Sequence, residues 1–341
     1  MLIYNTIFVL LSFLALLDLS HKKNLLFFLF PCFILLLLTA IRGNGGDDFY
    51  VYEKYFNALP DEIFNYGYGY YSLNMFVKNF GEYPFFIIIS SVICITLQAI
   101  FIYRETEKPT LVLFLFYSTS FLWLDFILIR QSISVGFFIL AISFFKNNKN
   151  IFACLFLILS SLFHETAIFA GVVFYILYRA GKAGFLFTIG SLLIITPFLS
   201  DIITVINDMT IKNNNITLYL EQRTLPSIAN VIELTIAFVA FYIIKKNSVF
   251  RESKEYKIYR SILYSSLCIL LLSYTIPSLA RFLEFFRFFY FILVVRMLMQ
   301  FNVRSRYLFL VIILAYCFMR LNSFINQFDS GFDYIYNGKI L

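Results

Sequence analysis

The amino-acid sequence predicts an all-α polytopic membrane protein. Of the 341 residues, 61% are hydrophobic and 14% are charged, whereas a soluble globular protein is about 45–50% apolar and about 25% charged. With 45 Phe and 24 Tyr, the aromatic share reaches 21%, and the mean hydropathy is +0.82. Long apolar runs also recur along the whole chain. These values exclude a soluble domain, a disordered chain and a disulfide scaffold.

Twelve apolar runs are candidates for crossing or entering a membrane, since a spanning helix needs about 20 mostly apolar residues and about 17 at the least. The runs fall near 2–17, 25–41, 84–103, 110–127, 128–145, 151–163, 166–178, 184–199, 231–244, 261–276, 286–301 and 307–319. We therefore expect about 12 transmembrane or partly inserted helices. They form a single integral membrane domain over residues 1–341, with long outer loops at 42–83, 200–230 and 320–341.

The stretch from 151 to 178 is expected to form two short helices that meet at His164. Basic residues flank it on both sides, at Lys149 and Arg179. A single crossing would put one of these cations outside, whereas a pair of short helices keeps both inside. Polar groups at membrane depth are tolerated only where they line a cavity or are buried in protein. The tip of this pair is therefore expected to present His164 and Glu165.

The charges favour an orientation with both termini outside. The cytoplasmic segments then carry 17 basic and 5 acidic residues, and the outer segments carry 10 basic and 15 acidic residues. The resulting net charges are +12 inside and −5 outside, which together give the net charge of +7. Because the basic residues gather in short inner loops, the positive-inside rule is obeyed. Membrane anchoring thus explains the net charge, and no nucleic-acid partner is expected.

Metal and redox chemistry receive little support from the sequence. The five cysteines lie inside apolar runs, and none of them has ligand or redox spacing. The two histidines, His21 and His164, exclude a His-rich metal centre but leave a carboxylate site open.

The outer face uses arginine more than lysine. The outer arginines are Arg42, Arg130, Arg223, Arg281, Arg287 and Arg320. A guanidinium offers a planar fork that matches a phosphate or a carboxylate bidentately, so these residues predict an anionic ligand. Snorkelling or an ion pair with an outer acid is the alternative for any single arginine.

Four polar clusters lie between or at the ends of the apolar runs. They are Arg42 to Tyr52, Asp125 to Ser132, His164 to Thr166, and Arg281 to Arg287. The glycines after Arg42 do not have the spacing of a phosphate-binding P-loop, and adjacent Asp47 and Asp48 are a weak metal signal. Capping of a helix is an equal alternative for one of these acids. In the fourth cluster an internal Arg–Glu pair is the alternative to a ligand site.

These clusters, in this order, resemble the EpsG family of bacterial exopolysaccharide proteins and the wider Wzy-type O-antigen and capsule polymerases. The matching positions are Arg42, Gly46, Asp48 and Tyr52, then Ile129-Arg130-Gln131-Ser132, then Phe163-His164-Glu165-Thr166-Ala167, and finally Arg281-Phe282. Members often carry a glutamate shortly before a stretch that is Tyr71-Ser72-Leu73-Asn74 here. This chain has Tyr66-Gly67-Tyr68-Gly69 at that point instead.

The resemblance implies a fold like that of the C-type glycosyltransferases and a reaction at the outer face of the bacterial cytoplasmic (inner) membrane. The donor would be a glycan on undecaprenyl pyrophosphate, and the acceptor a lipid-linked repeat unit. No cofactor is implied, because the polymerases resemble metal-independent enzymes. The membrane lipids, a chain-length regulator and a flippase are the partners that the resemblance suggests.

Within that reaction, the residues divide into two expected roles. The candidate bases for the acceptor hydroxyl are His164, Glu165 and Asp48, with His164 preferred because histidine titrates near neutral pH. The candidates for binding pyrophosphate or substrate are Arg42, Arg130, Arg281, Arg287, Arg223, Tyr52 and Gln131.

Three other functions remain open from the residues alone. An O-antigen ligase would use the same donor with a different acceptor. A polysaccharide transporter or flippase would carry intramembrane charges on several helices, together with symmetric repeats. A membrane acyltransferase would direct its histidine at an activated acyl donor on the inner side.

Overall fold

The computed structural model describes residues 2–43, 47–59, 66–210, 227–327, 334–336 and 339–340. Within these residues the chain is helical, apart from one antiparallel pair of two-residue strands, β1 (Ile335–Tyr336) and β2 (Lys339–Ile340). The chain divides into two compact units, Met1–Ile168 with Leu298–Leu341, and Phe169–Met297. The predicted all-helical architecture is confirmed, while the count of twelve inserted helices, the single domain and the likeness to C-type glycosyltransferases stay predictions.

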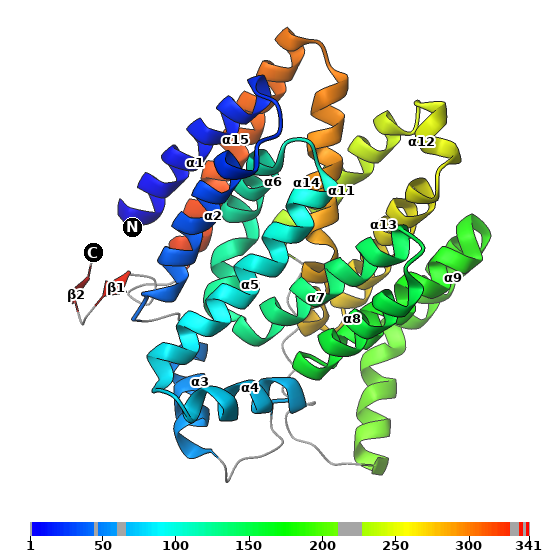
Figure 1. Cartoon of the computed structure of the whole chain (residues 1–341). Coiled ribbons are helices and arrows are strands. Elements are labelled where there is room, and N and C mark those ends of the chain that lie inside the picture. Colours follow the sequence, from blue (N-terminus) through cyan, green and yellow to red (C-terminus); the bar gives the residue numbers. More distant parts are fainter. Residues whose placement is uncertain are drawn as a thin grey trace. The chain divides into compact units, whose positions relative to one another are not determined.

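The first unit holds most of the helices, and Figure 1 labels its α-helices. They are α1 (Leu2–Ser20), α2 (Leu25–Ala40), α3 (Asp47–Ala58), α4 (Tyr68–Lys78), α5 (Tyr83–Glu105), α6 (Pro109–Phe116), the π-helix η1 (Tyr117–Ile127), α7 (Ile129–Lys146), α8 (Asn150–Phe163) and α15 (Val303–Ile325).

The second unit contains the remaining helices. Apart from the first residues of α9 and the last of α14, they lie wholly within it. They are α9 (Thr166–Thr210), α11 (Ile228–Ile244), α12 (Ser248–Glu252), α13 (Lys254–Ser273), the 3₁₀-helix η2 (Pro277–Leu283) and α14 (Glu284–Gln300).

Every predicted apolar run overlaps a helix, and the run 110–127 covers both α6 and η1. Six helical stretches among the described residues are long and apolar enough to cross a membrane, and α2, α8 and α11 are shorter apolar helices. The chain is therefore a multi-pass membrane protein. The runs 166–178 and 184–199 both lie on α9, whose helical backbone is interrupted at Gly181 by φ 64° and ψ −147°. A positive φ of this kind suits glycine, so this residue marks the boundary between the two runs.

Segment 42–83 differs from the long loop expected there, because it contains α3 and α4. Phe49, Tyr52, Phe56 and Leu59 recur at helical spacing and are all buried. The Lys78 ammonium then donates to the carbonyl oxygens of Phe56, Asn57 and Leu59 at 2.9, 2.9 and 2.8 Å. A cation at a helix C-terminus satisfies the unpaired carbonyls and complements the helix dipole, so α4 fixes the end of α3.

Buried polar contacts join the apolar helices of the first unit. Asp18 of α1 accepts from the backbone amides of Thr110 and Leu111 at 3.0 and 3.3 Å, which caps the start of α6. In return, Lys108 donates to the Asp18 and His21 carbonyls at 2.8 and 2.6 Å, which caps the end of α1.

A serine pair holds α7 against α8. The Ser134 hydroxyl donates to the Ser160 carbonyl at 2.8 Å, and the Ser160 hydroxyl donates to the Ser134 carbonyl at 2.7 Å. Both serines are fully buried. Small hydroxyl residues of this kind let membrane helices approach closely while every polar group stays satisfied. The pair therefore sets the position of the end of α8.

Candidate functional site

The polypeptide breaks between α8 and α9 where the sequence predicts it. Helix α8 ends at Phe163, and α9 begins at Thr166. His164 is extended, with φ −152° and ψ 114°, and its amide donates to the Ser160 carbonyl at 3.1 Å. Its Nδ1 lies 2.6 Å from the Thr166 hydroxyl, which orients the ring. The imidazole is half-buried, and Glu165 beside it is exposed.

The start of α4 lies directly on the end of α8. A Cβ added to Gly67 would lie 3.0 Å from the Leu162 carbonyl oxygen, and one added to Gly69 would lie 3.0 Å from three atoms of Leu162. Gly67 also has φ +89°, which L side chains rarely adopt. Only glycine allows this approach, and it brings Tyr66 to the turn that carries His164.

Arg130, at the start of α7, faces the same place. Its guanidinium carbon lies 5.1 Å from the centre of the Tyr66 ring, within cation–π distance. The Tyr66 ring also contacts Tyr52 and Tyr55, at centroid distances of 6.1 and 4.7 Å. The Arg130 side chain is half-buried, and its Nε has no hydrogen-bond partner among the described residues. The structure thus gathers Arg130, Tyr66, Tyr52 and the His164 turn into one region, which we call the outer site after the membrane face on which the sequence predicts these residues.

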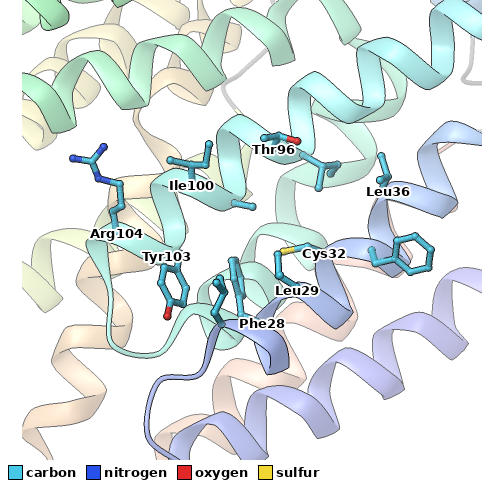
Figure 2. A pocket seen from close by; sticks show the side chains of 12 residues that line it. Phe28, Leu29, Cys32, Leu36, Thr96, Ile100, Tyr103 and Arg104 are labelled. Atoms are coloured by element: carbon cyan, nitrogen blue, oxygen red, sulfur yellow. The ribbon is translucent and has the colours of Figure 1, made fainter.

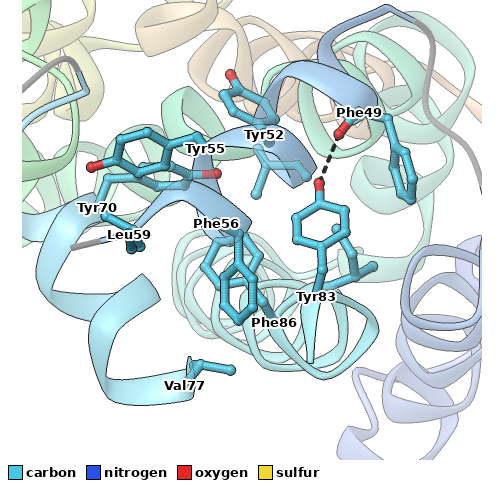
Figure 3. Packing of buried hydrophobic residues seen from close by; sticks show 11 residues of the cluster. Phe49, Tyr52, Tyr55, Phe56, Leu59, Tyr70, Val77, Tyr83 and Phe86 are labelled. Atoms are coloured by element: carbon cyan, nitrogen blue, oxygen red, sulfur yellow. Dashed lines mark hydrogen bonds between the residues drawn. The ribbon is translucent and has the colours of Figure 1, made fainter. Parts of the chain in front are cut away.

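A cluster of buried aromatic rings packs around Tyr52 and Tyr66 of this region. Figure 3 shows Tyr52, Tyr55 and Tyr70 packed with Phe56 and Phe86. Burial among these rings, with the neighbouring Tyr52 phenol second, raises the pKa of Tyr70 well above its usual range. The phenol therefore stays neutral and packs rather than ionises. Phe49, Tyr52, Tyr55, Phe56 and Tyr70 thus belong to a buried core.

Arg42 lies in a second network, which is fully buried. Its Nη1 donates to the Asp125 carbonyl at 2.8 Å, and its guanidinium lies 4.5 Å from the Phe126 ring centre. The Asp125 carboxylate accepts from Gln98 at 2.9 Å and from the Ser132 hydroxyl. The network joins the end of α2 to α5, η1 and α7. It therefore fixes the start of α7, where Arg130 is found.

Gln98 is the network member that sequence reasoning missed. It is 1% exposed in the middle of α5, a helix apolar enough to cross a membrane. A polar side chain at the centre of such a helix needs a partner inside the protein, and that requirement is the signal that would have found it.

The remaining candidate residues of the first unit, Asp48 and Gln131, differ in burial. Asp48 is half-buried in the first turn of α3, while Gln131 is 2% exposed. The position of Arg223 lies outside the described residues.

In the second unit Arg287 forms ion pairs with two carboxylates. Its Nη1 lies 2.8 Å from Glu233, its Nε lies 3.1 Å from Glu284, and its Nη2 donates to Asn230. All four side chains are buried. The internal Arg–Glu pair considered from the sequence is therefore present, formed by Glu284 with Arg287. Arg281, in contrast, is exposed on η2. The ligand-binding roles of both arginines stay predictions.

Comparison with known protein families agrees with the motifs. The EpsG family matches residues 24–336 of the chain. No curated protein and no solved structure matches the chain. The matched span includes the buried Arg42 network, the outer site and the Arg287 network. Because it covers nearly the whole sequence, the chain belongs to the EpsG family.

Proposed function

We propose that this protein is a polysaccharide polymerase that transfers a glycan from undecaprenyl pyrophosphate to a lipid-linked repeat unit. Its outer site would face the outside of the bacterial cytoplasmic membrane. Membership of the EpsG family supports a role in polysaccharide polymerisation. The observation that carries the finer proposal is the outer site itself. There an arginine with no carboxylate partner among the described residues shares one region with a histidine.

The proposed reaction breaks one bond and forms another. The acceptor hydroxyl attacks the anomeric carbon of the donor glycan, and the bond from that carbon to the pyrophosphate oxygen breaks. The electron pair leaves with the polyprenyl pyrophosphate, so negative charge grows on the leaving group. Donors placed where charge develops stabilise the transition state more than the ground state. Arg130 is the residue we assign to that task.

The proton of the acceptor hydroxyl needs a base. We assign this role to His164, whose Nδ1 lies 2.6 Å from the Thr166 hydroxyl. In the tautomer that this role requires, Nδ1–H donates to the Thr166 hydroxyl and Nε2 accepts the proton. Glu165 and Asp48 are the other candidates. Arg42 and its network, in this proposal, position the start of α7 and do not touch substrate.

The test is polymerisation by the purified full-length protein in liposomes, supplied with lipid-linked repeat units and read as a ladder of products. The wild-type protein is expected to make ladders. Arg130→Lys keeps the charge but loses the planar fork, so we expect a fall of about 10²–10³-fold in rate. Arg304→Lys makes the same change at an exposed position of α15 and is the control.

Each outcome separates one of the functions. Full polymerisation by Arg130→Lys would show that the reaction does not need the guanidinium of Arg130. When a lipid A core acceptor is added to the same liposomes, transfer of a single finished glycan to it, without ladders, would make the protein a ligase. Movement of the lipid-linked unit across the liposome, with no new glycosidic bond, would make it a flippase.

A further inference from the structure

An apolar groove runs along the first unit between α2 and α5. Its volume is about 450 Å³, which lies within the range of about 300–1,000 Å³ typical of small-molecule sites. Figure 2 shows side chains of both helices lining it, with Leu36 towards one end and Tyr103 and Arg104 at the other. Phe28 and Tyr103 stack at the second end, with ring centres 5.8 Å apart.

The groove has the depth of one membrane leaflet. On α2 its lining extends from Leu25 to Leu36, which is about 16 Å at a rise of about 1.5 Å per residue. The hydrocarbon core of a bilayer is about 30 Å thick, so that one leaflet contributes about 15 Å. Leu25, Leu29 and Phe33 on this wall are each about half exposed. A single acyl chain is therefore the occupant that matches the groove in both length and polarity.

Cations gather at one end of the groove. Arg104 belongs to the lining, and the Lys23 ammonium lies 4.5 Å from the ring centre of Tyr103. Glu105, beside Arg104, is buried and accepts from Ser143 at 2.6 Å and from Lys146. Within the described ranges no carboxylate forms an ion pair with Lys23 or Arg104. This end therefore carries positive charge that an anionic headgroup would neutralise.

The cationic end is remote from the outer site. Lys146 at the end of α7 pairs with Glu105, next to Arg104. Arg130 lies 16 residues earlier on the same helix, which is about 24 Å. A lipid whose headgroup lies at Arg104 cannot place that headgroup at Arg130, so the polyprenyl substrate of the proposed reaction is not the expected occupant.

We propose that the groove between α2 and α5 is a binding site for an anionic phospholipid. One acyl chain lies in the groove between Leu36 and Phe28, and the phosphate lies at Lys23 and Arg104. The bound lipid covers the wall that α2 leaves exposed and neutralises the two cations.

The test is native mass spectrometry of the full-length protein, purified in detergent with equal amounts of phosphatidylglycerol and phosphatidylcholine. Wild-type protein is expected to retain one phosphatidylglycerol in preference to phosphatidylcholine. Replacement of both cations, Lys23→Gln with Arg104→Gln, should weaken that preference by about fivefold for each charge removed. Lys149→Gln, an exposed cation on the α7–α8 loop, is the matched control and should keep the preference.

A second pair of variants tests the groove itself. Thr96 lines it, so that Thr96→Trp should fill it and abolish retention. Val92→Trp adds the same ring one turn away, outside the lining, and should retain phosphatidylglycerol as the wild type does. Equal retention of the two lipids by the wild type, or normal retention by Thr96→Trp, would overturn the proposal. Displacement of phosphatidylglycerol by an equal concentration of undecaprenyl pyrophosphate would assign the groove to the substrate and also overturn it.

Discussion

Arg42 and Arg130 are both expected from the sequence to bind an anion, but their surroundings differ. Arg42 is 5% exposed and donates to the carbonyl of Asp125. Arg130 is half-buried over Tyr66. The Nε atoms of both arginines have no hydrogen-bond partner among the described residues, so burial is what distinguishes the two. A buried guanidinium with an internal acceptor holds structure together, whereas one at the surface can reach a ligand. The sequence identifies both arginines, but only tertiary packing distinguishes their surroundings.

His164 carries the most direct prediction at this scale. Replacement by alanine removes the proposed base, so His164→Ala should lower the rate of polymerisation by about 10²–10⁴-fold while the protein still inserts in the membrane. The measurement is the initial rate of ladder formation in liposomes. Ser161→Ala, one turn earlier and bonded only to Ile158 of its own helix, should keep the wild-type rate. An unchanged rate in His164→Ala would move the base to Glu165 or Asp48.

Gln98 carries a prediction of stability. Gln98→Leu leaves the buried Asp125 carboxylate without one of its donors, and an unsatisfied buried polar group costs about 1–3 kcal/mol. A lower midpoint of thermal unfolding, measured in detergent, is the expected result. Val92→Thr alters an exposed residue of α5 that lies outside the groove lining, and it should leave the midpoint unchanged. Equal midpoints for both variants would mean that the Asp125 network does not hold these helices together.

Among the elements, the contact of α4 with α8 assembles the outer site. Every apolar run is visible in the sequence because membrane helices are uniformly hydrophobic. Helices α3 and α4 cannot be identified in this way, because their buried faces are built from tyrosines that alternate with polar residues. The π-helical form of η1 is likewise not predicted, because the apolar run 110–127 indicates a helix but not its hydrogen-bond pattern. The sequence thus predicts the apolar helices, while the geometry of the site depends on contacts between distant segments.

A glycine substitution tests that contact. In Gly69→Ala the new methyl group would lie 3.0 Å from backbone atoms of Leu162, so α4 and α8 must separate by a few tenths of an ångström. We expect at least a tenfold fall in polymerisation, because Tyr66 and Arg130 then lose their position beside His164. Gly190→Ala on α9 meets no atom within 4 Å and should be neutral or slightly stabilising. Wild-type activity in Gly69→Ala would show that the reaction does not need the α4–α8 contact.

For the whole molecule, the distribution of charge between the two faces is the property to test. The predicted orientation puts Lys149 inside and Glu165 outside, at opposite ends of α8. A membrane-impermeant maleimide added to intact cells should therefore label Glu165→Cys. It should label Lys149→Cys only after the cells are permeabilised. The wild-type protein, with its five native cysteines, gives the background. The reverse pattern would invert the topology and place the outer site in the cytoplasm.

The length of α8 has a consequence for the bilayer. Its 14 residues span about 21 Å, against a hydrocarbon core of about 30 Å. A helix that starts at one membrane surface therefore ends about 9 Å short of the other, and the serine pair with α7 prevents it from sliding outward. Such hydrophobic mismatch is relieved when the surrounding lipid thins. The protein would then create its own shallow depression in the membrane, into which the headgroup of a lipid-linked sugar descends to meet His164.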